Sequence, residues 1–152
     1  MTASSLVDIE NGSFDQLCAE FEWQIPDSLN VAELTCSRHA DGSSKLALIC
    51  ESESGAQQHY SFDDIERLSN QLANAFLGWG IQRGDCVAVI LPQRVETALV
   101  HIAAQKIGAV SLPLSILFGD DALRNRLNDS QSKLVVNNQQ RVSLVDLSLI
   151  HI

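Results

Sequence analysis

Apolar residues recur every three to four positions after Ser61, which is the clearest pattern in the chain. The spacing predicts a long amphipathic helix. Ser61 followed by Asp64 has the composition of a capping box at the start of that helix. Gly78 and Gly80 end it, because glycine accepts the left-handed conformation that closes a helix. The apolar positions are Phe62, Ile65, Leu68, Leu72, Phe76 and Trp79.

Short apolar runs alternate with helical patterns from Cys86 onward. Cys86–Leu91 is apolar at every position, as in a strand of a parallel sheet that is covered on both faces. The order that follows is helix, strand, helix and strand, at Arg94–Ile107, Ala109–Leu112, a helix opening at Asp120 and Asp121, and Lys133–Val136. This alternation predicts an α/β fold, with a parallel sheet and right-handed crossover helices.

The region before this sheet has a mixed pattern. Residues 1–13 are polar and unpatterned, which predicts a flexible arm. Two short helices are expected next, at Phe14–Phe21 and from a cap at Asp27 or Ser28 to about His39. Two strand-like runs, Lys45–Cys50 and Gln57–Tyr60, predict a hairpin. A small helical and hairpin region therefore precedes the sheet.

Composition excludes several classes of function. The chain has 152 residues and 45% hydrophobic residues, enough for one globular core. The 19 acidic residues against 10 basic ones give a net charge of -9, which argues against nucleic-acid binding and against a basic membrane-surface helix. No apolar run reaches the ~18 to 20 residues of a membrane span. The N-terminus lacks a signal pattern, and the four scattered cysteines indicate a reduced, cytoplasmic chain.

Candidate chemical groups in the sequence are better explained as structural. The glycines of Gly78–Gly84 precede a strand, whereas a phosphate-binding loop follows one. The acidic pairs Asp63–Asp64 and Asp120–Asp121 occur at helix starts, where carboxylates interact favourably with the free backbone amides and the helix dipole. His101 is expected on an exposed polar stripe with Thr97 and Gln105. The four histidines, His39, His59, His101 and His151, have no partner at ligand spacing, and Cys50 and Cys86 are expected to be buried.

Several sequence blocks between Tyr60 and Asn137 resemble the N-terminal part of the AMP-forming acyl-CoA synthetases of the adenylate-forming family. Gly80–Ala88 resembles the family's "G-[VI]-x-x-GDRVA", and Ala104–Leu114 resembles "A-x-K-x-GA-x-x-x-PL". Leu117–Ser130 resembles the "LFGPDAL-x-x-RL-x-DS" of the branch acting on acetate-like, medium-chain or aromatic acids. The remaining matching blocks are Tyr60–Ile65, Ser69–Ala75 and Leu91–Gln93, and the departures are Gln93 for asparagine and Asp120 for proline.

The resemblance implies an ATP-dependent acid–CoA ligase as the parent enzyme, with a role in fatty acid metabolism. That parent would use ATP, magnesium and coenzyme A with a small carboxylic acid. The family's phosphate loop, adenine motif, ribose-binding acid and C-terminal lysine lie downstream of the matched part. No catalytic, cofactor-binding or metal-binding residue is therefore assigned in this chain, and the fragment is expected to be inactive alone.

The resemblance also implies a domain division. Residues 14–146 would form the incomplete N-terminal subdomain of the adenylate-forming fold, with part of its Rossmann-like sheet. Residues 147–152 (LSLIHI) resemble the translation of the transposon mosaic end used in sequencing libraries, so a non-native tail is expected there; a natural apolar strand is the alternative. An incomplete sheet is expected to aggregate. The alternative functions are a stand-alone α/β protein-interaction module without catalysis, and a complete small enzyme with a distinct site.

Overall fold

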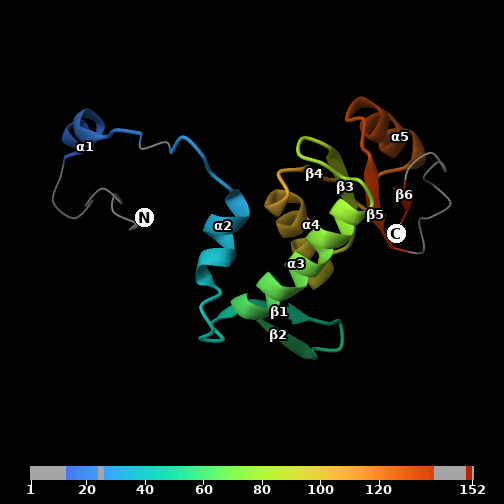
Figure 1. Cartoon of the computed structure of the whole chain (residues 1–152), viewed down its shortest axis with the longest axis horizontal. Helices are drawn as coiled ribbons and strands as arrows, with labels where there is room; N and C mark the ends of the chain where they lie inside the picture. The colour runs from blue at the N-terminus through green and yellow to red at the C-terminus, as the bar shows by residue number, and fades with distance from the viewer. Residues whose placement is uncertain (1–12, 24–25, 139–149, 152) are drawn as a thin grey trace.

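The computed structural model describes residues 13–23, 26–138 and 150–151 (Figure 1). The predicted order of helices and strands is confirmed between residues 14 and 137. The first part contains α1 (Phe14–Glu20), α2 (Val31–Thr35), the 3-10 turn η1 (Ser37–His39), β1 (Leu46–Glu51), β2 (Gln57–Ser61) and α3 (Phe62–Gly78). The second part contains β3 (Cys86–Ile90), α4 (Val95–Lys106), β4 (Val110–Pro113), α5 (Asp120–Asp129), β5 (Leu134–Asn137) and β6 (Ile150–His151).

The predicted parallel sheet is present, with β3 at its centre. The strand order is β4-β3-β5-β6. β3 pairs in parallel with β4, from Cys86 opposite Val110, and with β5, from Val87 opposite Leu134. Parallel neighbours need a crossover, which α4 and α5 supply. The hairpin of β1 and β2 forms a separate two-stranded antiparallel sheet, as predicted.

The continuous apolar run of β3 is explained by helices on both faces of the sheet. Val87 and Val89 pack with Phe76 of α3 and Val100 of α4. On the other face, a second cluster gathers around Ile90; it contains Ala88, Leu114, Leu123, Leu127 and Val135. A strand buried on both faces shows no alternation of apolar and polar residues, which is why Cys86–Leu91 could be identified as a parallel strand.

The start of α3 has the predicted capping box. The Ser61 hydroxyl accepts a hydrogen bond from the Asp64 amide at 3.1 Å, and the Asp64 carboxylate accepts one from the Ser61 amide at 3.1 Å. At the end of α4, Gly108 has a positive φ of +71°, and a Cβ there would lie 3.0 Å from Cγ of Arg83. Only glycine fits that turn without strain.

Two local predictions need correction. Asn30, rather than Asp27 or Ser28, caps the second helix: its side chain accepts from the Ala32 amide at 2.9 Å and also donates to the carbonyl of Lys106 at 3.1 Å. The observed cap, which also bonds to α4, lies two or three residues later than local sequence suggests. Cys50 and Cys86 are half-buried rather than buried, because Cys50 lies on the two-stranded hairpin and Cys86 is the first residue of β3.

A polar cluster joins η1, α3 and α4. The Glu66 carboxylate lies 2.7 Å from Nζ of Lys106 and accepts hydrogen bonds from Ser37 at 2.8 Å and Asn70 at 3.0 Å. Lys106 also donates to Oδ1 of Asn70 at 2.7 Å. The three elements are thus held together by charge-assisted bonds as well as by apolar packing.

In Figure 1, α1 lies away from the sheet and from the helices that cover it. Phe14, the first residue of α1, and Trp23, which follows the helix, are strongly exposed. No helix in the described part of the chain is long and apolar enough to cross a membrane.

Candidate functional site

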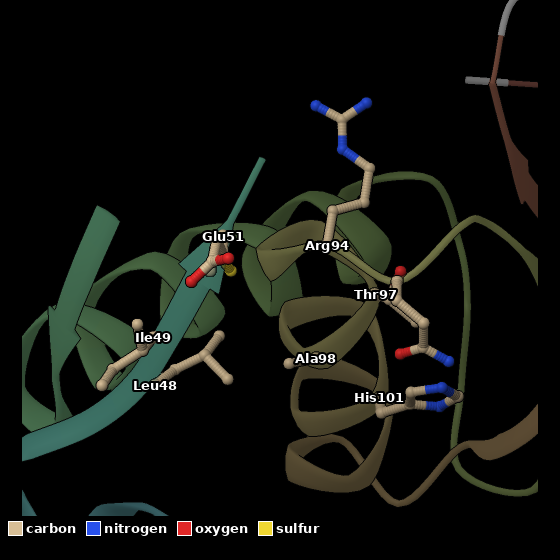
Figure 2. Close-up of a pocket in the computed structure, with 9 residues that line it drawn as sticks. Leu48, Ile49, Glu51, Arg94, Thr97, Ala98 and His101 are labelled. Carbon is tan, nitrogen blue, oxygen red and sulfur yellow. The ribbon is translucent and has the colours of Figure 1, made fainter. Parts of the chain in front are cut away.

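A groove of about 490 Å³ lies between the hairpin and α4 (Figure 2). Leu48 of β1 and Ala98 of α4 face each other across it, which gives the groove an apolar floor. Polar side chains stand around this floor. The complete lining is Leu48, Ile49, Cys50, Glu51, Gln93, Arg94, Thr97, Ala98 and His101.

Several of the polar side chains around this groove are already engaged by their neighbours. Thr97 donates to the carbonyl of Pro92 at 2.6 Å, and the Arg94 guanidinium makes two 2.9 Å bonds with the carboxylate of Glu96. The Glu51 carboxylate accepts a hydrogen bond from the side-chain amide of Gln57 on β2 at 2.7 Å. These contacts hold the groove's walls rather than present free groups to a ligand.

His101 departs from the sequence prediction of an exposed polar stripe. Its ring is partly buried, and Nδ1 shares a hydrogen bond with the Ser111 hydroxyl of β4. Burial lowers the pKa of His101, which favours the neutral imidazole. A serine beside a neutral imidazole is a feature of nucleophilic catalysis. Among the described residues, however, the ring has no other hydrogen-bond partner, so no carboxylate orients it, and the pair serves as a link between α4 and β4.

The carboxyl end of the sheet carries a different kind of group. Asn137 ends β5 opposite Ile90 of β3 and is only 8% exposed. Within the part of the chain that the structure describes, neither the oxygen nor the nitrogen of its side-chain amide has a hydrogen-bond partner. A buried polar group without a partner is costly, and the carboxyl ends of parallel strands are where open α/β sheets bind ligands. This position was missed from the sequence.

Both acidic pairs lie at helix starts, as predicted, but Asp63 binds amides of the preceding loop. Asp63 accepts from the amides of Gly42 at 2.9 Å and Ser44 at 3.0 Å, which ties the preceding loop to the start of α3. Hydrogen bonds from Ser61 lower the pKa of Asp64. Asp120 and Asp121 occupy the first turn of α5. Within the described ranges, no three acidic, histidine or cysteine side chains gather as a metal would require.

The sequence is similar to one enzyme family and to its curated members. A family model described as AMP-binding enzyme matches residues 37–149. The chain is 31% identical over 136 residues to an acetyl-coenzyme A synthetase of Escherichia coli strain K12, covering 88% of this chain and 21% of that protein. It is 38% identical over 128 residues to an acetyl-coenzyme A synthetase of Pasteurella multocida strain Pm70, covering 81% and 19%.

The fold is also similar to a solved structure. A crystal structure of a Brucella canis acyl-CoA synthetase superimposes with a TM-score of 0.82 and 27% sequence identity, covering 91% of this chain and 28% of that chain. The present chain thus spans about a fifth of the length of the curated relatives it matches.

Proposed function

The chain belongs to the AMP-binding enzyme family, and on that basis we propose that it is the N-terminal part of an acyl-CoA synthetase. The whole enzyme would be an ATP-dependent carboxylic acid–CoA ligase that releases AMP. The observation that carries this proposal is the match to the Brucella canis acyl-CoA synthetase, at a TM-score of 0.82 over 91% of this chain. Such a match includes most of the sheet and its crossover helices.

The proposed substrate is an acetate-like, medium-chain or aromatic acid. Two observations support this branch: the Leu117–Ser130 sequence block, and the acetyl-coenzyme A synthetases among the relatives. In the structure, this block forms the approach to α5, the whole helix and its C-cap residue Ser130. A cytoplasmic location and a role in fatty acid metabolism are part of the same proposal.

The chain alone is proposed to be inactive. Transfer of an adenylyl group needs charged groups around the phosphates of ATP. The sequence contains no phosphate loop, and the described residues offer no cluster that fits Mg²⁺. We therefore assign no chemical step to this part of the enzyme. Its contribution would be the sheet, with the unpartnered Asn137 amide at its carboxyl end. Exposed apolar side chains, among them Trp23 at 79% and Leu117 at 86%, support the expectation that the fragment aggregates.

A chimera tests the proposal. Residues 13–138 would replace the matched part of the Brucella canis acyl-CoA synthetase, and release of AMP would be measured with acetate, hexanoate and benzoate in the presence of ATP and coenzyme A. We expect acid-dependent AMP from the chimera and none from the 152-residue chain. A folded chimera that is inactive with every acid would argue against a synthetase. AMP release by the isolated chain would instead support the complete small enzyme.

A further inference from the structure

Three aromatic side chains lie at the ends of α1, in a segment that we call the aromatic segment (Phe14–Trp23). Phe14 is 78% exposed, Trp23 is 79% exposed, and Phe21 is about half exposed. Figure 1 shows α1 away from the sheet and from the helices that cover it. Single exposed apolar residues are ordinary, but a local group of three large aromatic side chains marks an interaction surface.

The aromatic segment has local order of its own. Ser13 caps α1 by accepting from the Gln16 amide at 3.3 Å, and the Gln16 side chain donates to Glu20 at 3.3 Å. The rings of Phe21 and Trp23 meet edge to face, with centroids 5.0 Å apart and planes at 83°. Rings already fixed against each other lose less conformational entropy on binding, so the segment is preorganised for a partner.

The charge of the segment indicates what kind of surface it fits. Asp15, Glu20 and Glu22 lie among the aromatic residues, and residues 13–23 contain no lysine or arginine. An apolar patch with a basic rim would complement this arrangement. An anionic membrane surface would repel it.

We propose that the aromatic segment docks on the part of the synthetase that lies outside this chain. This inference rests on the proposed function. The sheet and helices of the present chain do not cover the segment (Figure 1), whereas 72% of the Brucella canis enzyme lies beyond the matched 28% and supplies further surface. Phe14, Phe21 and Trp23 are the anchors, and the acidic residues form the rim of the contact.

Tryptophan fluorescence tests the docking in the same chimera. Trp23 and Trp79 are the two tryptophans of the chain, so W79F leaves Trp23 as its single emitter; tryptophans of the remaining part are replaced by phenylalanine. Trp23 is 79% exposed in this chain. If docking reduces the exposed fraction of Trp23 to about a fifth, its acrylamide quenching constant should be about fourfold lower in the chimera. F14S/F21S should restore the quenching of the isolated chain, whereas L77Q, on the exposed face of α3, should not.

The outcomes separate the docking from the proposed function. An active chimera with Trp23 as accessible as in the isolated chain overturns the docking and leaves the synthetase proposal intact. Protection of Trp23 that is lost in F14S/F21S supports the docking, even in a chimera without activity. Protection that survives F14S/F21S overturns the assigned anchors. Protection that already rises with concentration in the isolated chain overturns the assigned partner in favour of a second copy.

Discussion

Replacing Lys106 by methionine would leave the Glu66 carboxylate without its cation. Nζ of Lys106 lies 2.7 Å from Glu66, and the two side chains are only 12% and 25% exposed. Methionine keeps an unbranched apolar stem of similar length to that of lysine. The change therefore isolates the loss of charge and hydrogen bonds from a loss of packing.

The expected cost lies between two limits. Breaking a fully buried pair destabilises a protein by about 3–5 kcal/mol, while an exposed pair contributes about 0.2–1 kcal/mol. Because Lys106 and Glu66 are partly buried, we expect K106M to lower the free energy of unfolding by about 2 kcal/mol. R67M is the matched control. Its pair with Asp64 spans 3.4 Å, with the side chains 59% and 45% exposed, so its loss should be under about 0.5 kcal/mol.

Urea unfolding at several pH values would measure both variants. Burial raises the pKa of Glu66, but hydrogen bonds from Lys106, Ser37 and Asn70 outweigh it, so the pKa is lowered overall. Because the pKa is lower in the folded state, Glu66 contributes its full stabilisation at pH values above its pKa in the unfolded chain, about 4.3. This contribution is lost as the pH falls through the pKa of the folded state. The gap between wild type and K106M should therefore narrow below about pH 5. Equal losses for K106M and R67M at pH 7, or a gap that persists to pH 3, would refute the reasoning.

Three further variants and one labelling experiment follow from local geometry. G108A should lower stability by about 1–2 kcal/mol in thermal unfolding, because of its positive φ, whereas G78A in the open end of α3 should raise it by about 0.5–1 kcal/mol. S61A should cost about 1 kcal/mol through loss of the capping box, and a neutral result in the same melt would contradict that role. Burial raises the pKa of the Cys36 thiol to about 11, so iodoacetamide at pH 8 should label the exposed Cys18 first, as mass spectrometry of the peptides would show; equal labelling would disprove the burial.

The sheet and α3 could be predicted because local signals and tertiary packing agree there. Cys86–Leu91 is apolar throughout and becomes the central strand, and the Ser61–Asp64 spacing becomes a capping box. The start of α2 could not be placed, because Asn30 is chosen as its cap through a bond to the distant Lys106 carbonyl. Local propensity carries no information about such a partner.

The polar positions were harder to interpret than the apolar ones. His101 lies on a polar stripe, but β4 packs against that face of α4 and supplies Ser111 as a partner. The unpartnered Asn137 had a signal that could have been used, since two asparagines directly follow the apolar run of β5. The aromatic segment was predicted only as a short helix, because periodicity shows which residues share a face and does not show whether that face is covered.

The central position of β3 also sets an order for synthesis on the ribosome. β3 is made first, and its two neighbours are added by crossovers that are complete by Asn137. At about 5–20 residues per second, Cys86–Asn137 emerges in roughly 3–10 s. In a protein as long as the relatives, the remaining four-fifths would take several times longer. In a protein of that length, β3, β4 and β5 could thus pair while most of the polypeptide is still untranslated. During that interval, the acidic residues around Phe14 and Trp23 would help to keep the nascent chain in solution.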